Sequence, residues 1–205
     1  MSRQAHTALP RVAPILVSLR DQPFSSPQWL FEPKYDGFRG VFYLTRHGCA
    51  MFSRRGNHFR RFEELCRRIA AELPRREAIL DGEVVSVNKE GRVDFYGLMR
   101  GEGHLAYAVF DVLWLNGRDL RPLPLRNRKK RLERLVSGTG DTLVRVPSFE
   151  EHGRELFRAA CQLDLEGIVA KRTSDPYATE TSWYKIKNPA YTQAEGRGEL
   201  FERRI

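Results

Sequence analysis

Lys34, Asp36, Gly37 and Arg39 form the pattern Lys-x-Asp-Gly-x-Arg, whose residue types could perform chemistry. If each residue type has a frequency of about 5%, four fixed positions match by chance in about one window in 10⁵. Lysine is a nucleophile only as the neutral amine, and neighbouring cations disfavour its protonated form. A reactive lysine here would therefore require more basic side chains nearby and acidic residues that hold a divalent metal ion. The alternative is a surface hairpin with a Lys–Asp pair and a turn glycine.

Five short fragments downstream contain the residue types that such chemistry needs. They are Ser53-Arg54-Arg55-Gly56, Leu80-Asp81-Gly82-Glu83, Phe110-Asp111, Glu166-Gly167-Ile168-Val169-Ala170-Lys171 and Trp183-Tyr184-Lys185-Ile186-Lys187. Each fragment alone has an ordinary explanation: arginines on a hairpin surface, a core phenylalanine, a glutamate at a turn, or lysines that protect an edge strand from aggregation. All five fragments occur in the same chain as the Lys34 pattern and follow it in a consistent order. This combination outweighs the ordinary explanation of each fragment.

Together these motifs resemble the covalent nucleotidyltransferases, which are the DNA ligases, RNA ligases and mRNA capping enzymes. The resemblance covers residues 14–188, and the segments 27–32 and 183–188 are most similar to bacterial ATP-dependent DNA ligases of the end-joining type. It implies that Lys34 attacks the α-phosphorus of ATP, carries AMP as a phosphoramidate, and passes it to the 5′-phosphate of a nick. The 3′-hydroxyl then displaces AMP. ATP is favoured over NAD because only 33 residues precede Lys34.

The resemblance also implies a role for each of these residues. Catalysis is assigned to Lys34, Asp36, Arg39, Lys185 and Lys187. Nucleotide binding is assigned to Glu32, Lys34, Arg39, Arg54, Glu83, Phe110, Lys185 and Lys187, with Phe110 stacked on the purine and Glu32 accepting from the adenine amino group. A Mg²⁺ or Mn²⁺ ion is assigned to Glu166 and Glu83, and DNA contacts to Arg54, Arg55, Arg60 and Arg61.

Composition indicates a soluble globular protein: 41% of the 205 residues are hydrophobic and 30% are charged. The chain has no apolar run near the roughly 18 residues of a membrane helix and no signal-peptide pattern, so we expect a cytoplasmic protein without a membrane partner. The net charge of +9 favours a polyanionic partner, with nucleic acid first and an acidic membrane surface second. The resemblance implies that this partner is nicked or broken duplex DNA. No glycine-rich phosphate loop is present, so side chains must bind the phosphates.

Hydrophobic periodicity predicts an α+β fold of mainly antiparallel sheets flanked by helices. The resemblance implies that this fold has the covalent nucleotidyltransferase (ATP-grasp-like) architecture. Strands are predicted at 41–45, 50–53, 79–87, 93–95, 105–115, 144–146, 167–171 and 183–186. Helices are predicted near 62–73, 126–136 and 156–161. Because the side-chain period of a strand is two, Glu32 and Lys34 share a face. Gly37 is expected to allow a positive φ or close ligand approach.

The predicted domains are a nucleotidyltransferase (adenylation) domain at 1–190 and a C-terminal tail at 191–205. Only 18 residues follow Lys187, too few for the oligonucleotide-binding barrel that family ligases place there. We therefore expect slow self-adenylation or a partner protein that supplies this domain. Two alternatives to a DNA ligase core are an RNA ligase or capping-type enzyme, and a non-catalytic relic that binds DNA breaks.

Overall fold

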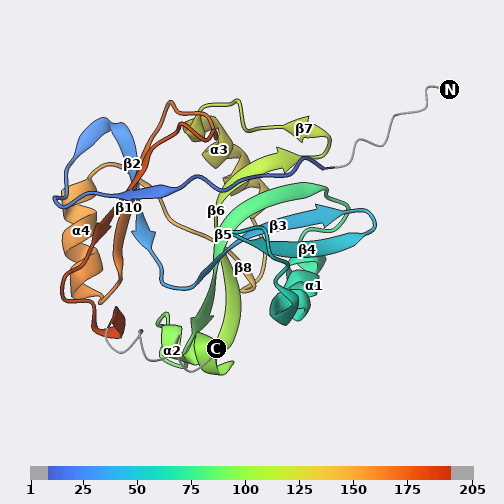
Figure 1. Ribbon diagram of the computed structural model, residues 1–205, viewed down its shortest axis with the longest axis horizontal. Helices are drawn as coiled ribbons and strands as arrows, with labels where there is room; N and C mark the ends of the chain where they lie inside the picture. Colours follow the sequence, from blue (N-terminus) through green and yellow to red (C-terminus); the bar gives the residue numbers. More distant parts are fainter. Residues whose placement is uncertain (1–8, 195–205) are drawn as a thin grey trace.

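The computed structural model describes residues 9–194, which form two β-sheets and four α-helices (Figure 1). The first sheet contains β1 (Val17–Leu19), β2 (Ser26–Lys34), β9 (Phe149–Glu151), β10 (Gly167–Arg172) and β11 (Trp183–Lys187), in the order β1-β11-β10-β2-β9. The second sheet contains β3 (Phe38–Thr45), β4 (Gly48–Ser53), β5 (Ala78–Val87), β6 (His104–Leu115) and β7 (Arg118–Asp119), in the order β4-β3-β5-β6-β7, with β8 (Leu143–Arg145) also paired to β6.

Helices cover the outer sides of the sheets. Figure 1 shows α4 (Gly153–Gln162) against the first sheet and α1 (Glu63–Glu72) beside the β3–β4 hairpin. The other elements are α2 (Phe95–Arg100), α3 (Leu125–Leu135) and the short 3₁₀ helices at Arg60–Phe62 and Thr192–Ala194. In the described part of the chain, no helix is long and apolar enough to span a bilayer.

Strand pairing is mainly antiparallel, and the α+β prediction is confirmed. Only the β1–β11 and β6–β8 pairs, among the residues described, run parallel. The strands β2 and β3 belong to different sheets, although only Tyr35, Asp36 and Gly37 separate them. The Lys34 pattern therefore begins on one sheet and ends on the other, at Arg39.

Side-chain alternation gives the first sheet two chemically different faces. On the outer face, Phe31 of β2 packs with Ala160 of α4 and Ile168 of β10 in a buried apolar cluster. The opposite face of β2 presents Glu32 and Lys34, because successive side chains of a strand point to opposite faces. The antiparallel register continues these two positions across the sheet, in the rows Glu32–Val169–Lys185 and Lys34–Gly167–Lys187. The inner face of the sheet thus gathers the polar residues.

Gly37 is required by close packing of the backbone, and the positive φ expected as one possibility is not found. Its φ does not lie in the left-handed region, and a Cβ built on it would lie 2.1 Å from the carbonyl oxygen of Val84 in β5. The turn after Lys34 is therefore pressed directly against the second sheet.

Gly37→Ala is expected to lower the free energy of unfolding by about 1–3 kcal/mol, because the added methyl must push the turn away from β5. Denaturant unfolding followed by circular dichroism measures this loss. An unfolding midpoint equal to that of the wild type would contradict the close contact with Val84.

One predicted element is wrong: residues 93–95 do not form a strand. Val93 makes only an isolated bridge with Val87, and the helix α2 begins at Phe95. Asp94 caps this helix, since its Oδ1 accepts a hydrogen bond from the backbone nitrogen of Gly97 at 2.9 Å. Aspartate is a favoured N-cap residue, and this local signal outweighed the short apolar alternation.

A buried ion pair joins α3 to the second sheet. Arg128 of α3 donates from Nε and Nη2 to the two carboxylate oxygens of Asp111 in β6, each at 2.9 Å, and both side chains are 0% exposed. Arg128 Nη1 also donates to the carbonyl oxygens of Leu123 and Asp175. These bonds fix α3 behind β6 and so set the position of the neighbouring residue, Lys129.

Most of the predicted tail at 191–205 lies outside the described residues, which end at 194. Its first residues contact the rest of the fold. Tyr191 is buried, and its hydroxyl donates to Asp36 at 3.1 Å. The side chain of Gln193 accepts a hydrogen bond from the backbone nitrogen of Phe95 at 2.7 Å.

Candidate active site

A cleft of about 590 Å³ lies between the inner faces of the two sheets. The first sheet contributes Glu32, Lys34, Val169, Lys171, Trp183 and Lys185 to its walls, and the second contributes Arg39, Glu83 and Phe110. Arg54 and Arg55 follow β4 and also line it. Eight of the residues predicted from the sequence therefore share one cleft: Glu32, Lys34, Arg39, Arg54, Arg55, Glu83, Phe110 and Lys185.

Five other predicted residues do not line this cleft. Asp36 is buried beneath Tyr191, and Glu166 lies beside Lys34. Lys187 is exposed at the end of β11, on the same strand face as Lys185. Arg60 is exposed, whereas Arg61 donates to the carbonyl oxygen of Leu98 at 2.9 Å. The prediction that Arg60 and Arg61 contact DNA therefore concerns a neighbouring surface.

Lys34 is held by a carboxylate in this structure. Its Nζ lies 2.5 Å from Oε2 of Glu166, which immediately precedes β10. The next residue, Gly167, has a φ of +138°, and a Cβ on it would lie 2.0 Å from the carbonyl oxygen of Ile186. Only glycine fits there, and its conformation lets the chain turn so that Glu166 faces Lys34. A lysine attacks only as the neutral amine, so Lys34 would have to leave this ion pair before acting as a nucleophile.

Glu83 provides a second carboxylate on the opposite wall, directly across from Arg39 in the β3–β5 register. Burial raises the pKa of Glu83 to about 7, and the positive charges of Lys34 and Arg39 only partly oppose this rise. The negative charge of Glu166 raises the pKa of Glu83 further. Glu83 therefore faces both members of the Lys34–Glu166 pair.

Glu83 and Glu166 fit a site for a hard divalent cation. Glu166 contacts the Lys34 ammonium group directly, and Glu83 interacts electrostatically with both of them. Mg²⁺ in nucleotide sites commonly takes one or two protein carboxylates and completes its shell with water and substrate phosphates. The described residues contain no group of three or more histidine, cysteine, aspartate or glutamate side chains arranged for a metal. Phosphate oxygens would therefore have to complete the shell.

The elevated pKa of Glu83 predicts a stability that depends on pH. Between pH 4.5 and about 7, the folded protein holds a proton on Glu83 that the unfolded chain has released. The contribution of Glu83 to the free energy of unfolding therefore falls by about 1–3 kcal/mol as pH rises through this window, and is constant above it. Glu83→Gln should remove this part of the slope.

Metal-free protein is unfolded with denaturant at several pH values, and the difference between the wild type and Glu83→Gln isolates Glu83 from the other titrating groups. Glu90→Gln is a matched control because Glu90 is exposed. Parallel stability curves for the wild type and Glu83→Gln would contradict the elevated pKa.

Arg39 is anchored to the wall of the cleft. Its guanidinium donates to both carboxylate oxygens of Asp81, at 3.1 and 2.7 Å, and to the carbonyl oxygen of Ile15 at 2.6 Å. The hydroxyl of Tyr177 donates to the same Asp81 carboxylate at 2.7 Å. The expected action of Arg39 on a nick remains a prediction, but in this structure Arg39 ties β3, β5 and the segment before β1 together.

Glu32 lies deep in the cleft between two lysines for which the sequence analysis gave no role. Its Oε2 accepts from Lys171 Nζ at 2.6 Å, and its Oε1 accepts from Lys129 Nζ. Lys129 also donates to the carbonyl oxygen of Phe110 at 2.6 Å. Burial lowers the pKa of both lysines, and the negative charges of Asp111 and Asp81 partly oppose this shift at Lys171. Glu32 is the carboxylate that both lysines contact.

The sequence carried a signal for each of these lysines. Lys171 is two residues after Val169 and therefore on the inner face of β10. Lys129 lies between Leu125 and Leu132 on the apolar face of α3, at positions i, i+4 and i+7. A lysine on the apolar face of a helix is buried and requires an acidic partner. The cations on the exposed face of this helix are solvated and require none; they are Arg126, Lys130 and Arg134.

An apolar floor adjoins this charged cluster. Phe110 meets Trp183 edge to face, with ring centroids 5.9 Å apart, and both rings line the cleft with Val146 and Val169. Lys171 Nζ lies 4.2 Å from the centroid of Phe110 and 3.9 Å from that of Trp183. This combination of flat apolar walls and a few polar groups suits a heteroaromatic base.

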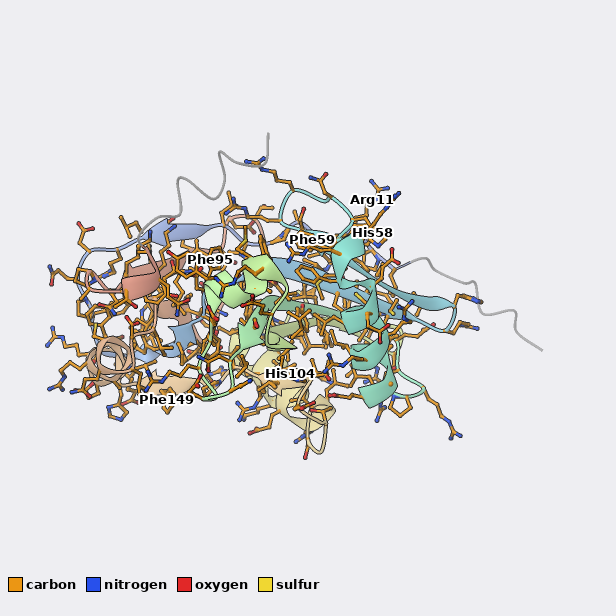
Figure 2. All side chains as sticks on the ribbon, turned by 90° about the horizontal axis from the view of Figure 1, so that it is seen from below. Arg11, His58, Phe59, Phe95, His104 and Phe149 are labelled. Carbon is orange, nitrogen blue, oxygen red and sulfur yellow. The ribbon has the colours of Figure 1, made fainter. Side chains whose placement is uncertain are left out.

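The mouth of the cleft is basic. Arg54 and Arg55 lie in a tight turn after β4, are exposed, and have no carboxylate partner among the described residues. Phe59 lines the same rim and lies beside His58 near α1, away from Phe149 (Figure 2). Exposed, unpaired arginines beside a cleft suit contacts with nucleic-acid phosphates.

Comparison with known proteins agrees with this geometry. Residues 16–187 match the model of the ATP dependent DNA ligase domain family. The chain belongs to this family. The ligase domain is 34% identical over 185 residues to the multifunctional non-homologous end joining protein LigD of Pseudomonas aeruginosa, and the match covers 86% of the chain and 22% of LigD. It is 28% identical over 192 residues to the SPbeta prophage-derived DNA ligase-like protein LigB of Bacillus subtilis, covering 89% of the chain and 69% of LigB.

Solved structures agree with the fold of the ligase domain. A mycobacterial DNA ligase D complexed with ATP and MES superposes with a TM-score of 0.77 at 28% identity, over 85% of this chain and 60% of the other. The ligase domain of Mycobacterium tuberculosis LigD gives a TM-score of 0.76 at 27% identity, over 85% and 59%. The chain thus spans about a fifth of the length of the Pseudomonas LigD and about three fifths of these solved chains.

Proposed function

We propose that this ligase domain forms a lysyl-AMP intermediate on Lys34 from ATP and seals 5′-phosphate/3′-hydroxyl nicks in duplex DNA during break repair. The observation that carries the proposal is the single cleft that joins Lys34 to Lys185 and Glu83 on its walls, beside an apolar floor that suits a base. A surface hairpin, the alternative explanation of the Lys34 pattern, would leave these groups apart.

The proposed reaction has three steps, and in each step one bond between phosphorus and a heteroatom forms while another breaks. Lys34 Nζ loses one proton to become the neutral amine and bonds to the α-phosphorus of ATP as the bond to the pyrophosphate oxygen breaks, and a second proton leaves the nitrogen to give the phosphoramidate. A 5′-phosphate oxygen of the nick then displaces the lysine and takes AMP. Finally the 3′-hydroxyl oxygen, giving up its proton, bonds to the 5′-phosphorus, and AMP leaves. Each step moves one bond, so positioning and charge stabilisation supply most of the catalysis.

Glu166 controls the state of Lys34 in this scheme. The 2.5 Å ion pair is the resting form, and Lys34 must separate from Glu166 before it can attack. Glu166 and Glu83 would hold Mg²⁺ or Mn²⁺, and such an ion when bound shares the negative charge of the phosphates. Lys185, in the neighbouring row of the same sheet face, then neutralises the α-phosphate, and the proposal gives the same role to Lys187 on the same strand face.

The remaining assignments complete the proposal. Phe110 supports the purine, Glu32 accepts from its amino group, and Asp36 and Arg39 act at the nick. Arg54 and Arg55 at the mouth, with Arg60 and Arg61 beyond it, contact the DNA backbone. Residues 1–190 form the adenylation unit, with 191–205 as its tail. LigD relatives are named for non-homologous end joining, which supports broken duplex DNA as the substrate.

The direct test is covalent labelling of the 205-residue chain. The protein is freed of bound AMP with pyrophosphate, incubated with α-labelled ATP and Mg²⁺ or Mn²⁺, and separated by denaturing electrophoresis. The label should remain on the protein, and peptide mass spectrometry should locate AMP on Lys34. AMP on another residue, or an unlabelled protein under both metals, would refute the proposal.

Two comparisons separate the alternatives to a DNA ligase. Labelling by GTP in preference to ATP would indicate a capping-type enzyme, and sealing of nicked RNA in preference to nicked DNA would indicate an RNA ligase. Duplex DNA binding without labelling, and without sealing of a pre-adenylated nick, would indicate a DNA-binding relic.

A further inference from the structure

The end of the cleft proposed to bind the base contains three buried charged side chains, Glu32, Lys129 and Lys171. A single acceptor would be enough to form a hydrogen bond with a base. Glu32 is 2% exposed and is bonded by Lys171 through one oxygen and by Lys129 through the other. The lysines come from different walls: Lys171 lies on β10 of the first sheet, and Lys129 lies on α3 behind the second sheet. Burying three charges is costly, so the arrangement requires a function or a compensating geometry.

The two lysines determine what Glu32 can do. An isolated buried carboxyl group takes up a proton and becomes a hydrogen-bond donor. A carboxylate between two ammonium groups stays ionised and acts only as an acceptor. Each of its oxygens has about two lone pairs, so bonding one lysine each still leaves one acceptor site per oxygen. Glu32 lines the cleft, so these sites can accept hydrogen bonds from a base bound there.

The surroundings also fix the orientation of this carboxylate. Lys171 Nζ is packed between the rings of Phe110 and Trp183, the apolar surfaces proposed to support the base. Lys129 donates to the backbone of Phe110 as well as to Glu32. Both lysines therefore tie the position of the acceptor to the position of the stacking ring. A base that stacks on Phe110 would present its edge to an oxygen held at a set distance.

We propose that Lys129 and Lys171 are specificity-determining positioning residues, which hold Glu32 as an oriented, acceptor-only carboxylate that selects a purine carrying a 6-amino donor. Guanine carries an acceptor oxygen at position 6, which would lie against the acceptor oxygen of Glu32 and form no hydrogen bond with it. This inference rests on the proposed function for the identity of the site, but it concerns the binding of the base and not covalent chemistry.

The test is a cycle in which both the enzyme and the nucleotide are varied. Equilibrium binding of ATP and of purine riboside triphosphate, which lacks the 6-amino group, is measured by calorimetry without divalent metal. The wild type should bind ATP about tenfold or more tightly than the analogue, as expected for a hydrogen bond to a charged group. In Lys129→Met and Lys171→Met this ratio should fall below about threefold, because Glu32 is protonated or rotates away.

Controls separate this role from a merely structural one. Lys130→Met, at an exposed position of the same helix, should keep the wild-type ratio. Loss of packing alone would weaken binding of both nucleotides equally and leave their ratio unchanged, which would overturn the proposal. If the methionine variants fail to fold, Lys171→Arg, which keeps the charge, should retain the wild-type ratio. A wild type that does not distinguish ATP from the analogue, or binds neither, also overturns it. Labelling is not needed for any of these outcomes, so failure of Lys34 chemistry is distinguished from failure of this inference.

Discussion

Lys34→Arg is expected to reduce covalent labelling by ATP at least about 1000-fold, the order of effect seen when a nucleophile is removed. Arginine keeps a positive charge opposite Glu166, so the ion pair that fills this part of the cleft is retained. Its guanidinium remains protonated in proteins and cannot act as the nucleophile. Time courses with α-labelled ATP, analysed on denaturing gels, measure the loss.

Two comparisons identify this loss as chemical. Lys89→Arg, at an exposed position after β5, should be labelled like the wild type. Sealing of a pre-adenylated nick should be much less impaired than labelling in Lys34→Arg, because AMP is already on the DNA and no lysyl bond is formed. Labelling of Lys34→Arg at the wild-type rate would assign the nucleophile to another residue.

Arg128→Met is expected to cost about 3–5 kcal/mol of the free energy of unfolding. The change leaves the carboxylate of Asp111 in a site where both side chains are 0% exposed, and it removes the donors to the carbonyl oxygens of Leu123 and Asp175. Uncompensated buried charge is among the few single changes with an effect this large. Urea unfolding at neutral pH measures it.

The matched control is Arg126→Met, two residues away on the exposed face of α3, which should change stability by less than about 0.5 kcal/mol. The double variant Arg128→Met/Asp111→Leu should recover much of the loss, because it removes both charges together. If Arg128→Met were as stable as Arg126→Met, the ion pair would contribute nothing to holding α3.

Sequence periodicity was sufficient to place the inner face of the first sheet. The period of two put Glu32 with Lys34 and Lys185 with Lys187, and the register of β2, β10 and β11 aligns these pairs. Local spacing also located most strands and three of the α-helices. It failed at 93–95, where a capping aspartate and a short helix replaced the expected strand.

What the sequence could not supply was the pairing of charges across long separations. Arg39 carries a motif position, but its partner Asp81 is selected by the β3–β5 pairing and not by any local pattern. Lys129 is 97 residues from Glu32 along the chain, and only the packing of α3 behind β6 brings them together. Such contacts depend on how the sheets assemble. A sequence motif can therefore identify the residues of a site but not the side chains with which they form ion pairs.

The strand order of the first sheet has a consequence for the newly synthesised chain. The strand that carries Lys34 is flanked by β9 and β10, which are made more than a hundred residues after it. A ribosome adds roughly 5–20 residues per second, so the emerging chain spends several seconds with this lysine but without Glu166 or Lys185. The inner face that brings Lys34 and Lys185 into one cleft is therefore complete only once β11 has left the ribosome.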